Sequence, residues 1–442
     1  MRTRRLVVAA MLLTTLSGCT GVRDATDQGA AQGASTQTGG AQGRDVLLLS
    51  TGDGSLIVDA GSGSVLARDA DALVAPDGSR LYATTRDGAT TTLEALDAVS
   101  GAVLSRTEVR GALDARVASL SGRRIALMDA LPEGEDPWVP IPRTHTTIVV
   151  ADPTGERATR RFRLNGNFEP EAFSIDDQRL FMIQYLPSEA PASYRVTTLN
   201  VADGAVRPVF GHFDTPPERM PGVRLRQIFD PRTDQLYTLY TTTPSEYAEG
   251  YWEGYGDKPG QSPKPGQAPK EEVSFVHVLN LRAGWAYCAG LPRGLWGQPA
   301  RALAMSTSPN GRILYVVDSV RGIVSEMNTK TLEIVRTEYV DLGSLEGTRT
   351  SVSTSADGST LFVGSATDGT AVYALDAGSL NVVHRWAVPG SVSDLGLSDD
   401  GARLYAAITD RVAVLDAASG TEVGTLQIGD VDAIVGVRSP GP

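Results

Sequence analysis

Short apolar segments recur along the chain, each preceded by a polar turn that contains Asp or Asn and Gly. The clearest copies are residues 308–316, 355–363 and 399–406. Asp-Gly or Asn-Gly between two apolar runs is typical of a β-hairpin, because these residues tolerate positive φ. No segment keeps a period of about 3.6 residues for long, which argues against a helical solenoid.

A second element follows each of these segments. It is an apolar strand that ends in Asp or Asn, then a turn, then another strand, as at residues 96–101, 375–379 and 415–420. Each repeat unit therefore holds four short strands joined by hairpins. The units recur about every 43 to 55 residues, and four-stranded antiparallel repeats of that length are typical of a β-propeller.

The two ends of the repeat region complement each other. Residues 46–67 are expected to form three strands that lack an innermost partner, and residues 431–437 form a lone strand after the last complete unit. Pairing these segments completes a blade and removes two free sheet edges. The prediction is eight blades, with seven as the alternative if one weak unit, 168–210 or 224–288, is only a decoration.

The copies at 308–316 and 355–363 resemble the YVTN-type repeat of bacterial propellers, in the same broad group as lactonase-like and quinoprotein amine dehydrogenase-like propellers. The resemblance covers roughly residues 46–438. It implies an all-β fold, a single β-propeller of four-stranded antiparallel blades, and implies little about function. A WD40 propeller is disfavoured because the Gly-His and Trp-Asp signatures of that repeat are missing.

The N-terminus has the parts of a bacterial export signal. A basic segment precedes an apolar run at residues 6–16, which is too short to span a bilayer. The sequence LSGC at residues 16–19 resembles the bacterial lipobox. The resemblance implies that residues 1–18 are a cleaved signal peptide and that Cys19 carries a lipid, which anchors the chain on the extracytoplasmic face of the cell membrane. An ordinary signal peptide with a chance cysteine is the alternative, and the export route, Sec or Tat, stays open.

Composition separates a tether from the folded domain. Residues 19–45 are rich in small and polar residues and predict a flexible tether, whereas residues 46–442 form the propeller with a long insertion at 241–272. The formal charge is −12, and it becomes −15 without the three arginines of the signal peptide. This balance argues against a nucleic-acid partner and against a basic membrane-docking face. The chain is expected to be monomeric.

Connection lengths predict where a ligand would bind. In a four-stranded blade the turns between strands one and two and between strands three and four share one face, and the remaining connections share the other. Six long segments all fall at the second kind of position: 129–144, 186–193, 211–222, 241–272, 289–300 and 339–348. They should crowd one face of the disc, and long loops on a rigid scaffold are where binding residues usually lie.

Aromatic residues in these loops are candidate ligand contacts. The insertion carries Tyr247, Tyr251, Trp252 and Tyr255, and two other loops of the same face carry Trp138 and Trp296. Rigid aromatic faces suit a peptide or a sugar. The alternative is that they only cover the blades below.

Arginines near the starts of three consecutive innermost strands, Arg224, Arg301 and Arg349, are also candidates. The corresponding positions of other units are mostly acidic: Asp71, Asp114, Glu169, Glu171 and Asp432. An arc of arginines would bind a carboxylate, a phosphate or an acidic sugar. Ordinary surface charge, or ion pairs across the channel, is the alternative.

Catalytic and metal chemistry has weaker support. The chain has only two cysteines, which excludes a paired-cysteine zinc site and a c-type haem, so no metal and no cofactor are predicted. Cys288 is expected to be a small buried apolar residue. His145 and His212, with Glu218 or Asp214, would be the acid, base or metal-binding groups of an enzyme. The other two histidines, His277 and His384, lie in strands away from the channel and are expected to be structural.

These observations favour a non-catalytic binding or scaffold propeller that holds a protein, a peptide or a cell-wall glycan at its loop-rich face. The alternative is a channel-mouth enzyme, lactonase-like or lyase-like, that acts on a small anionic or sugar-derived substrate. An enzyme needs acid, base or metal groups that converge at one point, whereas a binding module spreads its contacts over the loops.

Overall fold

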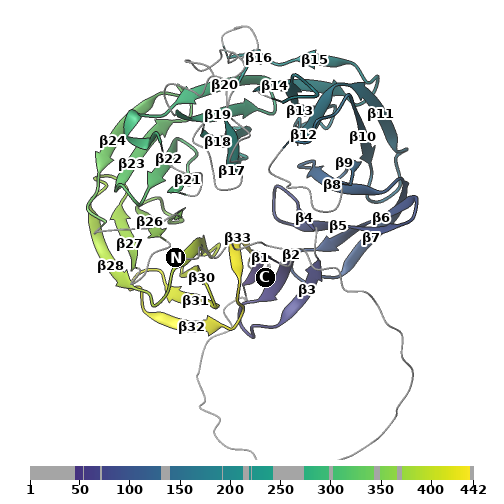
Figure 1. Ribbon diagram of the computed structural model, residues 1–442. Helices are drawn as coiled ribbons and strands as arrows, with labels where there is room; N and C mark the ends of the chain where they lie inside the picture. The colour runs from purple at the N-terminus through teal and green to yellow at the C-terminus, as the bar shows by residue number, and fades with distance from the viewer. Residues whose placement is uncertain are drawn as a thin grey trace, which may run out of the picture.

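The chain forms an all-β ring of eight sheets arranged around a central axis (Figure 1). The computed structural model describes residues 45–52, 54–69, 72–130, 140–191, 193–212, 219–220, 222–241, 273–297, 302–342, 349–365 and 371–438. Each sheet is a blade, and its strands follow one another in order from the axis to the rim. The eight-bladed propeller predicted from the repeats is confirmed, and the weak units at 168–210 and 224–288 are complete blades.

The blades are numbered along the chain, from the blade that holds both ends. Blade 1 contains β33 (Val431–Arg438), β1 (Val46–Thr51), β2 (Gly54–Asp59) and β3 (Val65–Asp69). Blade 2 contains β4 (Leu73–Val74), β5 (Arg80–Asp87), β6 (Thr90–Asp97) and β7 (Val103–Arg110). Blade 3 contains β8 (Leu113–Ala118), β9 (Ile125–Asp129), β10 (His145–Ala151) and β11 (Arg160–Asn165). Blade 4 contains β12 (Asn167–Phe173), β13 (Arg179–Leu186), β14 (Ser193–Asn200) and β15 (Val206–Pro208).

The second half of the ring repeats the plan with one addition. Blade 5 contains β17 (Val223–Asp230), β18 (Gln235–Thr241), β19 (Ser274–Asn280) and β20 (Trp285–Gly290), with β16 (Phe210–Gly211) added parallel to β20 at the rim. A 3-10 turn, η1 (Arg293–Leu295), follows β20. Blade 6 contains β21 (Leu303–Thr307), β22 (Ile313–Asp318), β23 (Ile323–Asn328) and β24 (Ile334–Tyr339). Blade 7 contains β25 (Thr350–Thr354), β26 (Thr360–Ser365), β27 (Ala371–Asp376) and β28 (Val382–Ala387). Blade 8 contains β29 (Val392–Leu397), β30 (Arg403–Ile408), β31 (Arg411–Asp416) and β32 (Glu422–Leu426).

In blades 4, 7 and 8 the turn between the first two strands is built by a Ser-x-Asp motif. In blade 8, Ser398 Oγ donates to Asp400 Oδ1 at 2.6 Å and accepts from the backbone N–H of Arg403 at 2.9 Å. Gly401 closes the turn with a φ of 71°. Glycine adopts this conformation at a lower energy cost than a residue with a side chain. The Ser and Asp side chains therefore provide hydrogen-bond partners for backbone groups of the turn, so these short sequences specify the hairpins locally.

The turn between the third and fourth strands lies beside the first. In blade 8, Asp416 Oδ1 accepts from Ser419 N at 2.8 Å and from Ser419 Oγ at 2.7 Å. The N–H of Ala417 donates to the carbonyl of Ala402 at 3.0 Å, which joins the two turns. We call the face that carries these two kinds of turn in every blade the short-turn face.

The opposite face carries all the other connections, and we call it the loop face. Neighbouring connections are joined there too, as Gly111 N to the carbonyl of Ala89 at 2.6 Å, and Asp430 N to that of Thr409 at 3.0 Å. Each of the six long segments predicted from the sequence links either strands two and three of a blade or one blade to the next. Their placement at loop-face connections is therefore confirmed.

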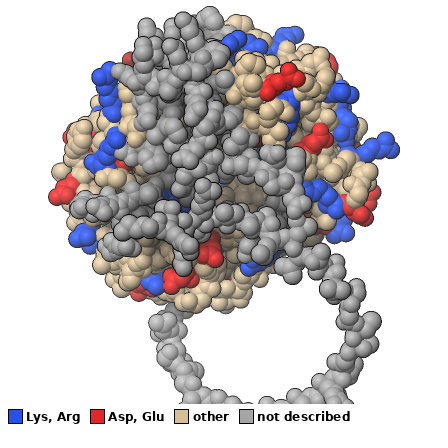
Figure 2. Space-filling view, viewed as in Figure 1, with Lys and Arg blue, Asp and Glu red and all other residues tan. Residues whose placement is uncertain are grey.

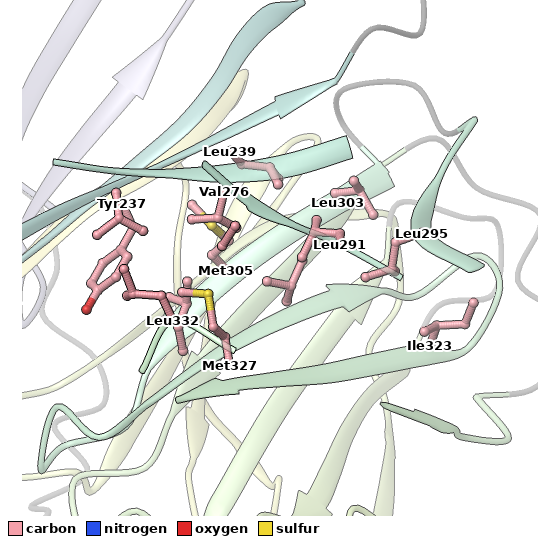
Figure 3. Packing of buried hydrophobic residues seen from close by; sticks show 14 residues of the cluster. Tyr237, Leu239, Val276, Leu291, Leu295, Leu303, Met305, Ile323, Met327 and Leu332 are labelled. Atoms are coloured by element: carbon pink, nitrogen blue, oxygen red, sulfur yellow. The ribbon is translucent and has the colours of Figure 1, made fainter. Parts of the chain in front are cut away.

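Apolar side chains fill the junction between each pair of neighbouring blades. Figure 3 shows the junction of blades 5 and 6, where Val276 and Leu239 face Met305 and Met327. Period-two alternation puts one side of a strand in one junction and the other side in the next, so the middle strands of a blade are buried on both faces. Burial of each such side chain stabilises the ring by about 1.5–3 kcal/mol.

Closure joins the two ends of the domain. The C-terminal strand β33 pairs antiparallel with β1, from Val46 opposite Arg438 to Thr51 opposite Val431, as predicted (Figure 1). Tyr405 of blade 8 donates to Asp45 Oδ2 at 2.6 Å, and the guanidinium of Arg403 lies 3.6 Å from the same oxygen. In blade 2, Tyr82 donates in the same way to a carbonyl in the first turn of blade 3. Asp45 thus takes the place of the turn that blade 1 lacks.

The outer edges of six blades are protected against further strand pairing. In five outer strands one residue is skipped in the register with the third strand, and the extra residue is an exposed aliphatic: Leu66, Leu104, Val335, Val383 and Val423. Such bulges blunt an edge. Blade 5 has no bulge of this kind, but β16 covers its edge. This fifth strand is an addition to the four-stranded plan, because the chain leaves blade 4 and runs along blade 5 before it turns inward.

No helix among the described residues is both long enough and apolar enough to cross a membrane.

The closing hydrogen bond of Tyr405 predicts a stability effect. We expect Tyr405→Phe to lower the free energy of unfolding by about 1–3 kcal/mol, because the buried Asp45 carboxylate loses a donor. Tyr373→Phe is the matched control, since the hydroxyl of this buried tyrosine has no hydrogen-bond partner among the described residues. The measurement is urea unfolding followed by fluorescence, and equal effects of the two variants would contradict the role of Tyr405 in closure.

The aspartate turns predict a loss of stability in acid. Serine hydroxyls hold the pKa of Asp357, Asp376 and Asp416 below the ordinary 3.8, and that of Asp357 is lowered to about 2. Because the folded pKa is lower, the unfolded chain binds more protons as the pH falls below about 4. Stability should therefore be present above that pH and decline towards pH 2. Replacing Ser355, Ser379 and Ser419 together by Ala should flatten this decline in urea titrations at several pH values, and an unchanged slope would refute it.

Candidate functional site

The innermost strands change register near the loop face. One residue is skipped in the pairing of β8, β12, β17 and β29 with their second strands, which leaves Arg116, Glu171, Leu225 and Ser393 as extra residues. A bulge re-aims the side chains around it and often occurs beside functional sites. The charged residues near the loop-face end of the axis are therefore the candidate site, which we call the mouth.

Arg226 crosses the mouth. From β17 of blade 5, its guanidinium lies 3.4 Å from Asp394 Oδ1 on β29 of blade 8 and donates to the carbonyl of Thr350 in blade 7 at 3.3 Å. These partners are two and three blades away from Arg226 around the ring. One side chain thus connects blades 5, 7 and 8.

Asp394 continues this connection to the closing strand. Its second carboxylate oxygen, Oδ2, accepts from the backbone N–H of Ile434 on β33 at 3.0 Å. Asp394 is only 8% exposed. A buried carboxylate is stable only when it is paired and hydrogen-bonded, and Arg226 together with Ile434 provides both conditions.

The acidic side of the mouth is paired as well. Asp114 Oδ1 lies 2.5 Å from Arg86 Nη1, and Asp114 Oδ2 lies 4.0 Å from Arg116. Glu169 accepts from Tyr185 Oη at 3.2 Å. Glu171 accepts a hydrogen bond from Gln227 of the next blade. Each of these carboxylates therefore already has a donor from the protein.

One arginine of the predicted arc is paired with an acidic residue from the same set of strand starts. Arg349 donates to the carbonyl of Asp432 and lies 3.8 Å from its carboxylate. The side chain of Arg224 and the whole of Arg301 lie outside the described residues. Arg349 thus pairs with an acidic residue of the mouth, and its role in ligand binding stays a prediction.

The histidines proposed for catalysis sit on different parts of the ring. His145 is exposed at the start of β10 in blade 3, and its Nδ1 lies 3.0 Å from Thr144 Oγ1. His212 stacks on Trp285 of the outer strand of blade 5, with ring centroids 4.2 Å apart. As predicted, His277 lies on β19 and His384 on β28, away from the axis.

Trp296 acts as a packing residue in its loop. Its indole Nε1 donates to the carbonyl of Leu291 at 2.8 Å, and the Arg293 guanidinium lies 5.6 Å from the ring centroid. Arg321 donates to the carbonyl of Trp296 at 2.6 Å, which connects this loop to blade 6. The loop that Trp296 belongs to is therefore held in place by specific contacts.

Several predicted site residues lie outside the described residues: Cys19, Asp71, Trp138, Asp214, Glu218, Tyr247, Tyr251, Trp252 and Tyr255. Cys288 was expected to be buried, and this part of the prediction was wrong. It is a thiol that is partly exposed on β20 at the edge of a pocket, because β20 is an outer strand rather than a middle one.

Sequence reasoning missed Arg226 and Asp394. A regular strand would put Arg224 and Arg226 on the same face, whereas the bulge at Leu225 sets them opposite Tyr240 and Leu239, two consecutive residues of β18. The bulge therefore puts Arg226 in register with Leu239. The only sequence signal was a second arginine two residues after the first, and nothing local indicates the bulge.

The surface charge is mixed. In Figure 2, basic and acidic side chains of the described residues are interspersed around the rim. Together with the pairs in the mouth, this indicates ordered ion pairs rather than a patch of one sign. Ion pairs of this kind hold the blades in register and leave the described arginines of the mouth engaged with the protein.

Comparison with known proteins identifies similar folds but no family. No protein-family model matches the chain, and no curated protein matches it. Dihydro-heme d1 dehydrogenase NirN in complex with DHE is similar with a TM-score of 0.51 and 16% identity, over 89% of this chain and 74% of that one. Apo AztD from Citrobacter koseri is similar with a TM-score of 0.50 and 12% identity, over 90% of this chain and 97% of that one. At such identities the likeness shows the propeller fold alone.

The bridge across the mouth predicts coupled stability effects. Arg226→Met and Asp394→Asn should each lower the free energy of unfolding by about 2–3 kcal/mol, since each leaves a largely buried charge without its partner. The double variant should cost about as much as one single change, because the two residues act as a pair.

The control pair is Arg106 and Glu94, where the arginine side chain is 66% exposed. Its removal should cost about 1 kcal/mol or less, because water screens exposed pairs. Urea unfolding of the single and double variants of both pairs gives the double-mutant cycles. Additive effects of the Arg226 and Asp394 changes would show that the bridge does not form in solution.

Proposed function

We propose that this chain is a lipid-anchored, extracytoplasmic binding propeller that holds a partner protein at its loop face, without catalysis. The observation that carries the proposal is that the ends of the domain and its long connections lie on opposite faces of the disc. The folded domain begins and ends on the short-turn face, and every long connection belongs to the loop face.

The position of the first strand supports this orientation. The carbonyl of Asp45 accepts from the N–H of Ala60, which lies in the third turn of blade 1 on the short-turn face. The last residue of β33, Arg438, donates to the carbonyl of Asp77 in the first turn of blade 2, also on that face. A lipid on Cys19 would therefore draw the short-turn face towards the membrane, and the loops would point away from it.

The contacts within the ring favour a broad protein contact over a small substrate. Arg226 and Arg349, the described arginines that cross the mouth, are held by Asp394 and Asp432. The bulged outer strands are poor templates for strand addition at the rim. The loops are therefore the surface best suited to a partner, because contacts there need not displace these pairs.

The proposal predicts which face meets the partner in cells. A photo-reactive phenylalanine analogue at Asp410 or His145, both exposed at the loop face, should crosslink one defined envelope protein. The same analogue at Ser62 or Ser419, both exposed on the short-turn face, should not. Crosslinked products are identified by mass spectrometry. A partner captured from the short-turn face alone, or a glycan in place of a protein, would overturn the proposal.

The anchor is tested in the same strain. Cys19→Ser should move the chain from the membrane pellet to the soluble fraction and remove the acyl mass from its N-terminal peptide. Cys288→Ser is the control and should leave the chain in the pellet. If Cys19→Ser also stays in the pellet with its mass unchanged, the lipid anchor is wrong, although a partner at the loop face would still stand.

A further inference from the structure

A pocket opens between the outer parts of blades 4 and 5. Its empty volume is about 280 Å³, which includes space open to solvent. It is lined by Val196, Val209, Gly211, Met220, His277, Ala286, Tyr287 and Cys288. Apolar groups thus surround one imidazole, one thiol and one thioether.

The segment that enters blade 5 carries Met220 over this pocket. Strand β16 runs parallel to β20, and the N–H of His212 donates to the carbonyl of Ala286 at 2.8 Å. The chain then returns to blade 4, where Met220 and Tyr194 exchange backbone hydrogen bonds of 2.8 and 3.1 Å. The position of Met220, only 3% exposed, is therefore specified by its backbone.

The imidazole and the thiol are direct neighbours. His277 on β19 and Cys288 on β20 are paired residues of an antiparallel ladder, so their side chains leave the same face of the sheet. The Cβ atoms of such a pair are about 4.5–5.5 Å apart. The imidazole nitrogen and the sulfur can therefore reach one point in the pocket between them.

The imidazole of His277 is buried and faces the pocket. It is 2% exposed, and no described residue forms a hydrogen bond with its ring. Its recorded neighbour is the Tyr240 ring, edge to face at 6.2 Å between centroids. Burial lowers the pKa of His277 to about 4, so the ring is neutral and keeps a lone pair at physiological pH. The ring lines the pocket, so a ligand there would meet its lone pair.

We propose that His277, Cys288 and Met220 bind one Cu(I) ion. A thiolate, a thioether and an imidazole form a soft donor set, and soft donors select Cu(I). Among the described residues no three His, Cys, Asp or Glu side chains gather to hold a metal, so the thioether of Met220 is needed to complete this site.

Charge balance in the apolar pocket favours the monovalent ion. When Cu(I) binds, the thiol of Cys288 loses its proton to solvent and the copper–sulfur bond forms, with no change of oxidation state. The thiolate then cancels the charge of the ion, and the pocket stays neutral. Zn²⁺ on the same donors would leave a net positive charge among Val196, Val209 and Ala286, which is unfavourable. Zn²⁺ also takes nitrogen, thiolate and carboxylate donors, whereas a thioether is not among its usual ligands.

The test is a competition for Cu(I) with bicinchoninate under anaerobic conditions. The full chain is used with Cys19→Ser, so that Cys288 is the only thiol. We expect one Cu(I) per chain. Cys288→Ser should weaken binding by about 100-fold or more and Met220→Leu by about 10-fold, as expected when ligands or their close supports are lost.

Two controls separate the site from folding effects. Met305→Leu, a buried methionine in the junction of blades 5 and 6, should bind Cu(I) as the parent does. X-ray absorption of the copper-loaded parent needs no variant and should show two sulfur ligands and one nitrogen ligand. No binding by the parent, a preference for Zn²⁺ over Cu(I), or absorption without sulfur ligands would each overturn the proposal.

Discussion

The pairing of β1 with β33 is the interaction on which the rest of the structure depends. Each blade buries its two faces against its neighbours, so an open arc would expose the apolar faces of blades 1 and 8. Closure removes both exposed faces and both free inner edges at once. Side chains reinforce it from two sides: Tyr405 and Arg403 bind Asp45 at the short-turn face, and Asp394 binds the N–H of Ile434 near the loop face.

The same constraint links the mouth to the fold. Asp394 holds the closing strand with one oxygen and Arg226 of blade 5 with the other, so the charge at the centre of the ring and the closure of the ring share one carboxylate. The ion pairs of the mouth are therefore structural in the first place. A partner that used these charges would have to compete with contacts that hold the ring together, which is why the proposed contact lies on the loops.

The two faces of the disc differ in chemistry for a local reason. On the short-turn face, Ser and Asp side chains satisfy the turn backbone, as at Ser398 and Asp400, and leave little variation in length. The connections of the loop face vary more in length, and one of them places β16 along blade 5 and Met220 against blade 4. That connection produces the pocket of His277, Cys288 and Met220, far from the axis.

The sequence by itself determined the features that arise from local chemistry and from periodicity. Asp-Gly turns and period-two strands predict the blades, and the unmatched segments at 46–67 and 431–437 predict the closure, because each depends on residues adjacent in the chain. Only the tertiary structure decided which side chains meet. The bulge at Leu225 moved Arg226 rather than Arg224 into contact with Asp394, and a ladder pairing set His277 beside Cys288. Arg226 and Asp394 are distant in sequence, and a one-residue shift in register would change either contact.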